Sequence, residues 1–249
     1  MKELIRKIVE ISGYTIVNAQ EWRRQQTQKK ITRTDLFSVY FSKVDPDKFF
    51  FVQIGANDGK TGDPIHGYIE RYGLHGVAVE PIPAAFDSLK ETYRARPEVT
   101  VVQAAIGSER TVLPFYSVKA KYMTKENFNA MTRSASFVKK NLMSSLRTKV
   151  PEGVDPETYV QETHIETITF PDLMIKTGTD RVDFLQIDAE GFDYEILKTV
   201  DLRRFRPEII NFESHHLSPQ DLSASRRMLE DAGYSWFEYG SDTCAYRAK

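Results

Sequence analysis

Short, continuous apolar runs recur along most of the chain, and amphipathic segments separate them. The runs cover residues 49–54, 76–79, 99–106, 182–187 and 208–212. Strands that are buried on both faces of a parallel sheet have this pattern, whereas half-exposed strands alternate apolar and polar residues. The segments between the runs are long enough to hold helices. The pattern therefore predicts an α/β fold with a doubly wound, mostly parallel sheet.

The segments between the runs carry the usual start and stop signals of helices. Asp63 followed by Pro64 is typical of a helix start, and Gly73 is typical of a helix end. Further helices are expected from Pro83, after Asp188, and from Ser218. Residues 234–248 read as two strands around a Gly-Ser-Asp turn, which predicts a closing antiparallel hairpin.

Two regions lie outside this alternation. Residues 1–48 have a helical pattern, with Leu4, Ile5, Ile8 and Val9 on one face and a second short helix over residues 35–41. We expect this N-terminal helical extension to cover the sheet edge or to form a dimer contact, which would make the protein a homo-oligomer. Residues 107–170 interrupt the rhythm between the third and fourth core strands. Because a structureless loop of roughly 60 residues is improbable, a substrate-covering subdomain is expected there.

Composition narrows the function classes. Lys and Arg number 34 against 35 for Asp and Glu, which provides no electrostatic reason to expect nucleic acid or an anionic membrane as a partner. The single cysteine, Cys244, excludes an internal disulfide. No apolar stretch approaches the ~20 residues of a membrane span, and charges interrupt the N-terminal apolar pattern, unlike a signal peptide. We expect a soluble, cytoplasmic protein.

Chemically informative residues follow the predicted strands. In an open α/β sheet ligands bind beyond the carboxyl ends of the strands. Gly55-Ala56-Asn57-Asp58-Gly59 follows the first run, where glycines let a ligand approach the backbone. Glu80 follows the second run, where a carboxylate accepts hydrogen bonds from ribose hydroxyls. Each signal alone also fits an ordinary turn or surface residue, but together they favour a nucleoside-containing ligand.

Acidic side chains and histidines follow the last two parallel runs. Asp188 and Glu190 come after one run, and Glu213, His215 and His216 come after the next. Carboxylates gathered at a strand edge are costly unless they bind something or stay hydrated. We therefore expect these side chains to face one catalytic cleft.

The motifs around these positions resemble the FkbM family of S-adenosylmethionine-dependent methyltransferases over about residues 49–217. "FVQIGANDG" is similar to the family's first motif, "GVAVEPIP" to its acidic motif, and "FLQIDAEGFDYEILK" to its I-D-x-E-G segment. Two departures are the missing third glycine of the first motif and Gln186, where a lysine is common. The resemblance implies a class I, Rossmann-like methyltransferase fold of seven strands with an antiparallel hairpin, formed by residues 49–249. It also implies O-methylation of a hydroxyl on a sugar, glycan or secondary metabolite.

The resemblance also implies roles for individual residues. The methionine half of S-adenosylmethionine would lie on Gly55, Ala56, Asn57 and Asp58. Glu80 would hold the ribose. The adenine would lie among four residues, Pro81, Ile82, Ala105 and Ile106. Asp188 and Glu190 would face the sulfonium and the acceptor.

Several alternatives stay open at this stage. His215, His216 or Asp188 would act as the general base, since imidazole exchanges protons near neutral pH. In a second scheme Asp188 and Glu213, with Glu190 or a histidine, would hold Mg²⁺ and acidify the acceptor hydroxyl. A glycine loop followed by an acid also fits an NAD-dependent oxidoreductase, although G-x-G-x-x-G is missing, and a non-catalytic nucleoside-binding protein is a further alternative. The basic segment 133–140 is interpreted as a solvated face or a mobile lid.

Overall fold

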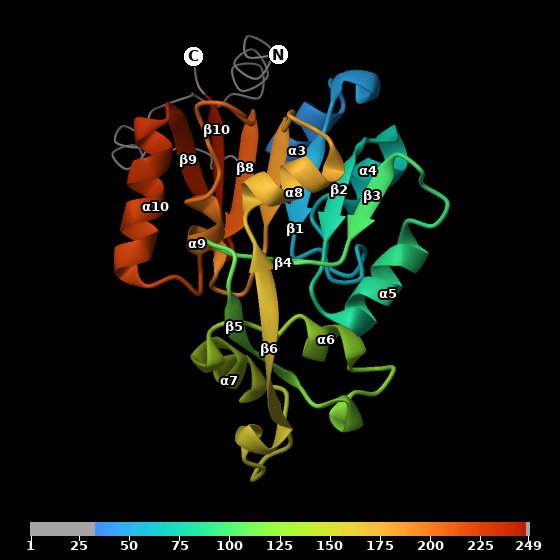
Figure 1. The fold of residues 1–249 in the computed structure, drawn as a ribbon, viewed down its shortest axis with the longest axis vertical. Coiled ribbons are helices and arrows are strands. Elements are labelled where there is room, and N and C mark those ends of the chain that lie inside the picture. The colour runs from blue at the N-terminus through green and yellow to red at the C-terminus, as the bar shows by residue number, and fades with distance from the viewer. Residues whose placement is uncertain (1–32, 248–249) are drawn as a thin grey trace.

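A seven-stranded sheet forms the centre of the molecule in the computed structural model, which describes residues 33–247. The strand order is β3-β2-β1-β7-β8-β10-β9 (Figure 1). The strands are β1 (Phe51–Ile54), β2 (Gly76–Val79), β3 (Val99–Val102), β7 (Phe184–Ile187), β8 (Ile209–Glu213), β9 (Tyr234–Tyr239) and β10 (Asp242–Arg247).

The predicted fold class is confirmed by the pairing of these strands. β1 pairs in parallel with β2 and β7, β2 pairs with β3, and β7 pairs with β8. β10 is antiparallel to both β8 and β9, so the chain ends in the expected hairpin. The order reverses between β1 and β7, which creates the switch point where ligands bind in such sheets.

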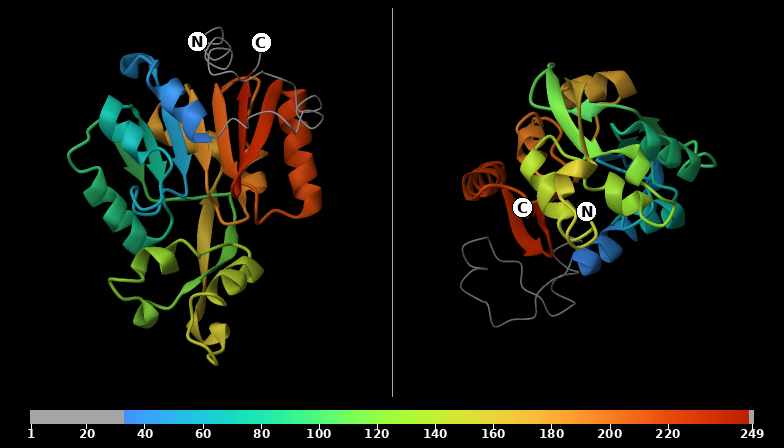
Figure 2. Two further views of the ribbon diagram at one scale, coloured as in Figure 1. Left: turned by 180° about the vertical axis from the view of Figure 1, so that it is seen from behind. Right: turned by 90° about the horizontal axis from the view of Figure 1, so that it is seen from below.

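Helices cover both faces of the sheet, because each face carries its own apolar side chains. Along β1, Val52 and Ile54 belong to a core cluster with α8 (Phe170–Thr177), α9 (Asp193–Leu197) and α10 (Pro219–Asp231). Phe51 belongs to a second cluster on the opposite face, with α3 (Arg33–Phe41), α4 (His66–Tyr72) and α5 (Pro83–Thr92). Figures 1 and 2 show these two layers from the front and from behind. None of the helices within residues 33–247 is long and apolar enough to cross a membrane.

α3 is the described part of the N-terminal extension. Its Phe37, Tyr40 and Phe41 are almost fully buried, and Phe37 and Phe41 make edge or tilted ring contacts with Phe184 of β7 at centroid distances of 5.1 Å. The second predicted N-terminal helix is therefore part of the sheet's own core. The first one, at Leu4–Val9 in the sequence, lies outside the described residues, and the predicted dimer contact stays a prediction.

A long arm extends from the carboxyl edge of the sheet and carries the inserted residues. β5 (Val112–Val118) and β6 (Val160–Ile168) pair antiparallel along its length. α6 (Phe128–Thr132) and α7 (Lys139–Leu146) lie between them and have a small core of their own, which includes Met131 and Leu142. The left view of Figure 2 shows the arm below the strand ends, and the right view looks at the molecule from the side of the arm. The two ends of the insertion, β5 and β6, thus anchor α6 and α7 beside the switch point.

Two predicted boundaries were wrong. The apolar run over residues 99–106 is not one strand: β3 ends at Val102, and Ala105–Ile106 forms β4, which pairs with β6 in a separate three-stranded sheet. The helix expected from Pro64 begins at His66. Asp63 supports the turn before it, because its Oδ1 accepts hydrogen bonds from the backbone N–H groups of Ile65 at 2.7 Å and His66 at 2.9 Å.

A row of polar side chains crosses the buried sheet beneath α3. Gln53, Gln186 and Asn211 are neighbours in the strand register and are almost fully buried. Asn211 Nδ2 donates to Gln186 Oε1 at 3.0 Å and to Asp242 Oδ2 at 2.8 Å. Gln186, the position where the family commonly has a lysine, is therefore paired within the sheet interior. A buried polar group that keeps its partners avoids most of its desolvation cost.

Candidate functional site

A pocket opens at the carboxyl ends of the parallel strands, beside the switch point. Loops after β1, β2, β3 and β7 form its floor, and the inserted arm forms its outer wall. The lining residues that sequence reasoning had singled out are Gly55, Asn57, Glu80, Pro81, Ile82, Ala105, Ile106, Asp188 and Glu190. The strand order thus brings together side chains that are more than a hundred residues apart.

Gly55 has a structural requirement that a turn alone does not explain. Its φ is +79°, in a region of backbone conformation that residues other than glycine seldom occupy. A Cβ at this position would lie 1.8 Å from the carbonyl oxygen of Asp188. The ends of β1 and β7 therefore approach each other so closely that only glycine fits, and the pocket begins at this contact.

Glu80 connects two of the loops that form the pocket. Its Oε2 accepts the backbone N–H of Asn57 at 2.9 Å, and its Oε1 accepts that of Ile82 at 2.9 Å. Burial raises the pKa of Glu80 to about 7, the two backbone hydrogen bonds oppose the rise, and the charge of Asp188 adds to it. A carboxylate oxygen has more than one acceptor position, so both oxygens can also take a donor from a ligand.

Two residues of the glycine loop lie outside the pocket. The side chain of Ala56 is buried in the core cluster that contains Phe51. Asp58 caps its own turn, because its carboxylate accepts hydrogen bonds from the backbone N–H groups of Lys60 at 3.0 Å and Thr61 at 2.7 Å. Within this loop, Gly55 and Asn57 line the pocket, and the contacts of Ala56 and Asp58 with the ligand stay predictions.

One end of the pocket is apolar. Pro81 and Ile82 line it after β2, and Ala105 and Ile106 line it from β4. Phe115 of β5 and Phe137 of the arm complete this end, with their ring centroids 5.1 Å apart. Aliphatic side chains together with two phenyl rings suit a planar ring such as a nucleobase.

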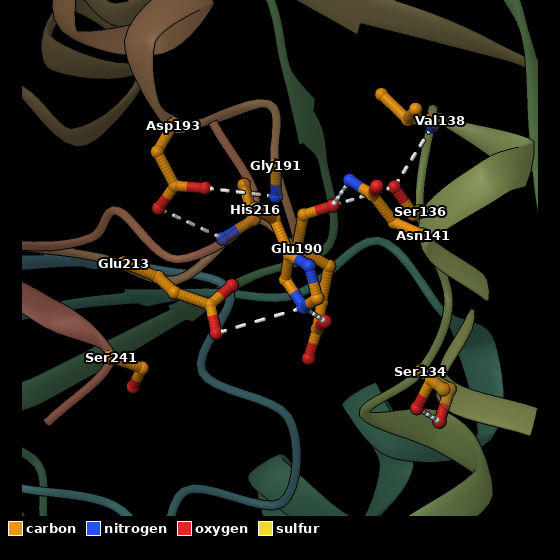
Figure 3. Close-up of polar contacts among 12 residues, drawn as sticks. Ser134, Ser136, Val138, Asn141, Glu190, Gly191, Asp193, Glu213, His216 and Ser241 are labelled. Atoms are coloured by element: carbon orange, nitrogen blue, oxygen red, sulfur yellow. Dashed lines mark hydrogen bonds and ion pairs between the residues drawn. The ribbon is translucent and has the colours of Figure 1, made fainter. Parts of the chain in front are cut away.

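The loop after β7 is held in an unusual conformation. Glu190 has a φ of +50° and Gly191 one of +97°. Fully buried Asp193 supports the turn: its Oδ1 accepts the backbone N–H of Ala189 at 3.3 Å, and its Oδ2 accepts that of Gly191 at 3.1 Å. This support directs the Glu190 side chain away from the loop and toward β8 (Figure 3).

Glu190, Glu213 and His216 form a cluster beyond the loop. Nε2 of His216 lies 3.2 Å from Oε2 of Glu190 and 4.0 Å from Oε1 of Glu213 (Figure 3). Burial raises the pKa of Glu213 well above its ordinary value, and the charges of neighbouring acids, led by Asp188, raise it further. Oε2 of Glu213 is buried and accepts no hydrogen bond from the residues described. The cluster therefore favours a cationic or proton-donating partner.

Of the two histidines, only His216 belongs to this cluster, and of the acids at these strand ends only Glu190 and Glu213 do. His215 is exposed, and its backbone N–H donates to the Ser241 carbonyl at 3.0 Å. Among the described residues, one group of side chains lies close enough together to hold a metal ion. It consists of Glu190, Glu213 and His216, whose possible ligand atoms lie within 4.8 Å of one another. Of the predicted ligand pair, Glu213 belongs to this group, and Asp188 lines the pocket, so its role as a metal ligand stays a prediction.

Asp188 faces the pocket from the end of β7. Burial raises its pKa most, the charge of Glu190 raises it further, and the charge of Arg133 opposes both. A buried carboxylate with a raised pKa is a frequent mark of functional sites. The site can therefore stabilise positive charge at the centre of the pocket.

Sequence reasoning missed the residues that the arm contributes. Thr132, Arg133 and Phe137 line the pocket, although segment 133–140, which contains two of them, is expected from the sequence to be a solvated face or a mobile lid. Ser136 Oγ and Asn141 Nδ2 both donate to the carbonyl of Glu190, at 2.7 and 2.9 Å. Only the length of the insertion hinted at this contribution, because none of these residues forms a recognisable motif with the strand ends.

A doubly wound sheet of this order, with a reversed final hairpin and a pocket over β1, β2 and β7, defines the class I methyltransferase fold. The chain belongs to the FkbM methyltransferase family: the family model of the methyltransferase FkbM domain matches residues 53–236. The predicted family is therefore confirmed, and this chain contains a methyltransferase domain.

One of three similar solved structures supports the fold. Methyltransferase FkbM from Methylobacillus flagellatus KT is 14% identical, with a TM-score of 0.52, over 87% of this chain and 48% of that chain. This chain thus spans about half the length of that protein. A precorrin-6y C5,15-methyltransferase from Geobacter metallireducens GS-15 is 17% identical over 89% of this chain and 91% of that chain, with a TM-score of 0.39. The N-terminal domain of human METTL16 in complex with SAH is 11% identical over 99% and 80%, with a TM-score of 0.40. None of the curated proteins matches this sequence.

Proposed function

We propose that this protein transfers a methyl group from S-adenosylmethionine to a hydroxyl of a sugar, glycan or secondary metabolite. The observation that carries the proposal is the pocket itself, which unites Gly55, Glu80 and Asp188 at the strand ends. Membership of a methyltransferase family supports a methyl donor over the NAD alternative and over a non-catalytic nucleoside-binding role.

The lining residues suit one orientation of the donor best. Its adenine suits the apolar end at Ile82, Ile106 and Phe115, and its ribose hydroxyls suit the carboxylate of Glu80. The methionine part then extends past Gly55 and Asn57. Its sulfonium comes near Asp188, where a negative side chain favours the positive sulfur. The Glu190 cluster lies beyond the sulfur, on the side from which an acceptor would approach.

The reaction is an in-line displacement. The acceptor oxygen forms a bond with the methyl carbon while the carbon–sulfur bond breaks, and its electron pair remains on sulfur as S-adenosylhomocysteine. Alignment of oxygen, carbon and sulfur provides most of the acceleration. The hydroxyl also loses its proton, so a base near the acceptor raises the rate further.

We assign the base to the Glu190–His216 pair. At 3.2 Å the carboxylate holds the imidazole in position for the transfer. His215 does not belong to the cluster of Glu190, Glu213 and His216, and so no carboxylate of that cluster positions its imidazole. Asp188 is better suited to the sulfonium than to the acceptor, because it lines the donor pocket.

A metal ion at the same cluster is the alternative. Two carboxylates and an imidazole suit Mn²⁺ or Zn²⁺ as well as the Mg²⁺ that the sequence suggested. Glu190, Glu213 and His216 would hold the ion, and a divalent cation supplies a Lewis acid that makes a nearby hydroxyl more acidic. Activity that survives exhaustive chelation excludes this alternative, and activity that is lost and then restored by one added metal supports it.

The acceptor is expected to be large, because so much of the chain is inserted between the third and fourth parallel strands of the main sheet, where it forms the arm (Figure 2). A glycan or small molecule with a free hydroxyl is the proposed partner. The cytoplasmic location and the homo-oligomer also remain proposals.

The test is a transfer assay with radiolabelled S-adenosylmethionine and a panel of glycans and hydroxylated metabolites. We expect label in an ether-linked methyl group that resists mild base. His216→Ala should abolish transfer while donor binding persists, and His215→Ala should retain most of it. Binding of NAD in place of S-adenosylhomocysteine would contradict the proposal.

A further inference from the structure

Arg133 connects the inserted arm to the donor pocket. It follows α6 directly and lines the pocket opposite the β1 loop. Its Nη1 donates to the Thr61 carbonyl at 3.3 Å. The neighbouring Thr132 Oγ1 donates to Asn57 Oδ1 at 3.2 Å, and Asn129 Nδ2 donates to Thr61 Oγ1 at 2.8 Å. Three contacts therefore fix this part of the arm on the loop that follows β1.

The charge of Arg133 contrasts with the rest of the pocket. Among the described residues that line it, Arg133 is the single cation, whereas Glu80, Asp188 and Glu190 are acids. Arg133 makes no ion pair with any carboxylate in residues 33–247, and most of its N–H donors are not used by the Thr61 carbonyl. A guanidinium with open donors in a pocket is suited to a carboxylate or phosphate, which it binds through two parallel hydrogen bonds.

The position of Arg133 indicates which anion it meets. It lies beside Asn57, Thr61 and Gly62, where a Cβ on Gly62 would come within 2.4 Å of Nη1. These contacts lie on the loop after β1, whereas the apolar residues that suit the adenine follow β2 or form β4. S-adenosylmethionine carries its carboxylate at the end remote from its adenine. We propose that Arg133 binds the α-carboxylate of the methyl donor, an inference that rests on the proposed function.

The inserted arm would then contribute directly to donor binding. Because Arg133 belongs to the insertion and the ribose contact belongs to the sheet, the donor bridges the two parts of the molecule. The arm then recognises the donor as well as covering the acceptor.

The test compares two ligands that differ by one carboxylate. S-adenosylhomocysteine and its decarboxylated analogue are titrated by calorimetry into the full chain and into Arg133→Gln, with thermal melts as a check of folding. Arg147→Gln is the matched control, because Arg147 is an exposed arginine on the same arm outside the pocket lining.

In the wild type we expect S-adenosylhomocysteine to bind about 10- to 100-fold more tightly than the decarboxylated analogue, the usual contribution of a charge-assisted hydrogen-bond pair. Arg133→Gln should lose this preference entirely, with the affinity for the analogue unchanged, and Arg147→Gln should keep it. Arg133→Lys should retain part of the preference.

Two results would overturn the inference in different ways. If Arg133→Gln binds S-adenosylhomocysteine as tightly as the wild type, Arg133 does not hold the donor, and a raised KM for an acidic acceptor would then assign it to the acceptor. If the wild type binds neither adenosyl ligand, the proposed function itself fails and this inference fails with it.

Discussion

Replacing Glu80 with glutamine probes the residue on which the donor assignment most depends. The amide keeps one acceptor oxygen but turns an NH₂ group toward one of the two backbone N–H groups, of Asn57 or Ile82, that the carboxylate now binds at 2.9 Å. It also removes a buried negative charge. The two changes act in opposite directions on stability, so their balance depends on pH.

The magnitude follows from the pKa of Glu80, which burial raises from 4.5 to about 7. This shift corresponds to about 3 kcal/mol between the two protonation states. The folded protein holds the proton more tightly than the unfolded chain, so this group's contribution is fully present below pH 4.5 and is lost as the pH rises to about 7. Glutamine has no such dependence. Relative to the wild type, Glu80→Gln should therefore gain about 2–3 kcal/mol in free energy of unfolding between pH 5 and pH 8.

Donor affinity should change in the opposite sense. In Glu80→Gln the two ribose hydroxyls of the donor find one acceptor oxygen fewer and no negative charge. This loss should cost about 3 kcal/mol of binding free energy, or roughly 100-fold in Kd. Calorimetry with S-adenosylhomocysteine at pH 8 measures this loss where the variant is most stable relative to the wild type. Glu91→Gln, an exposed change on α5, is the control. A variant with wild-type affinity and a wild-type pH dependence of melting would refute the reasoning.

Three further outcomes are expected. Gly55→Ala should disrupt the carboxyl ends of β1 and β7 or abolish donor binding, since its Cβ would lie 1.8 Å from the Asp188 carbonyl oxygen. Gly67 is in α4 with open space around it, so Gly67→Ala should instead raise the free energy of unfolding by about 0.5–1 kcal/mol. Melting curves distinguish the two, and a harmless Gly55→Ala would disprove the close contact. Asp193→Ala should lower turnover by misplacing the loop that carries Glu190, with S-adenosylhomocysteine affinity nearly unchanged; steady-state kinetics with unaltered kcat would count against this. Asn211→Leu should destabilise the protein by about 1–3 kcal/mol, because it leaves Asp242 and Gln186 without their shared donor; urea denaturation that shows no loss would argue against the buried polar row.

The strands and their ends could be predicted because buried parallel strands have a pattern that depends on burial alone. Gly55 and Glu80 followed from their positions after consecutive strands, and the FkbM motifs supported that interpretation. The run over residues 99–106 was misleading, since apolar residues resume at Ala104, directly after Gln103, although the backbone leaves the main sheet after Val102. Apolar pattern alone does not record such a change of partner.

The roles of individual side chains were less predictable, because they depend on contacts between distant segments. Arg133 has no sequence motif, and its place in the pocket depends on the packing of α6 against the β1 loop. His215 and His216 are adjacent and chemically identical, yet only His216 contacts Glu190. Ala56 and Asp58 belong to a recognised motif but serve the core and the turn.

The central claim is that the pocket over β1, β2 and β7 holds a methyl donor, and a crystal structure of the full chain with S-adenosylhomocysteine tests it most directly. We predict the ribose hydroxyls on Glu80, the adenine between Ile82 and Ile106, and the sulfur facing Asp188. A ligand bound elsewhere, or in the reverse orientation with its adenine at Arg133, would contradict the account.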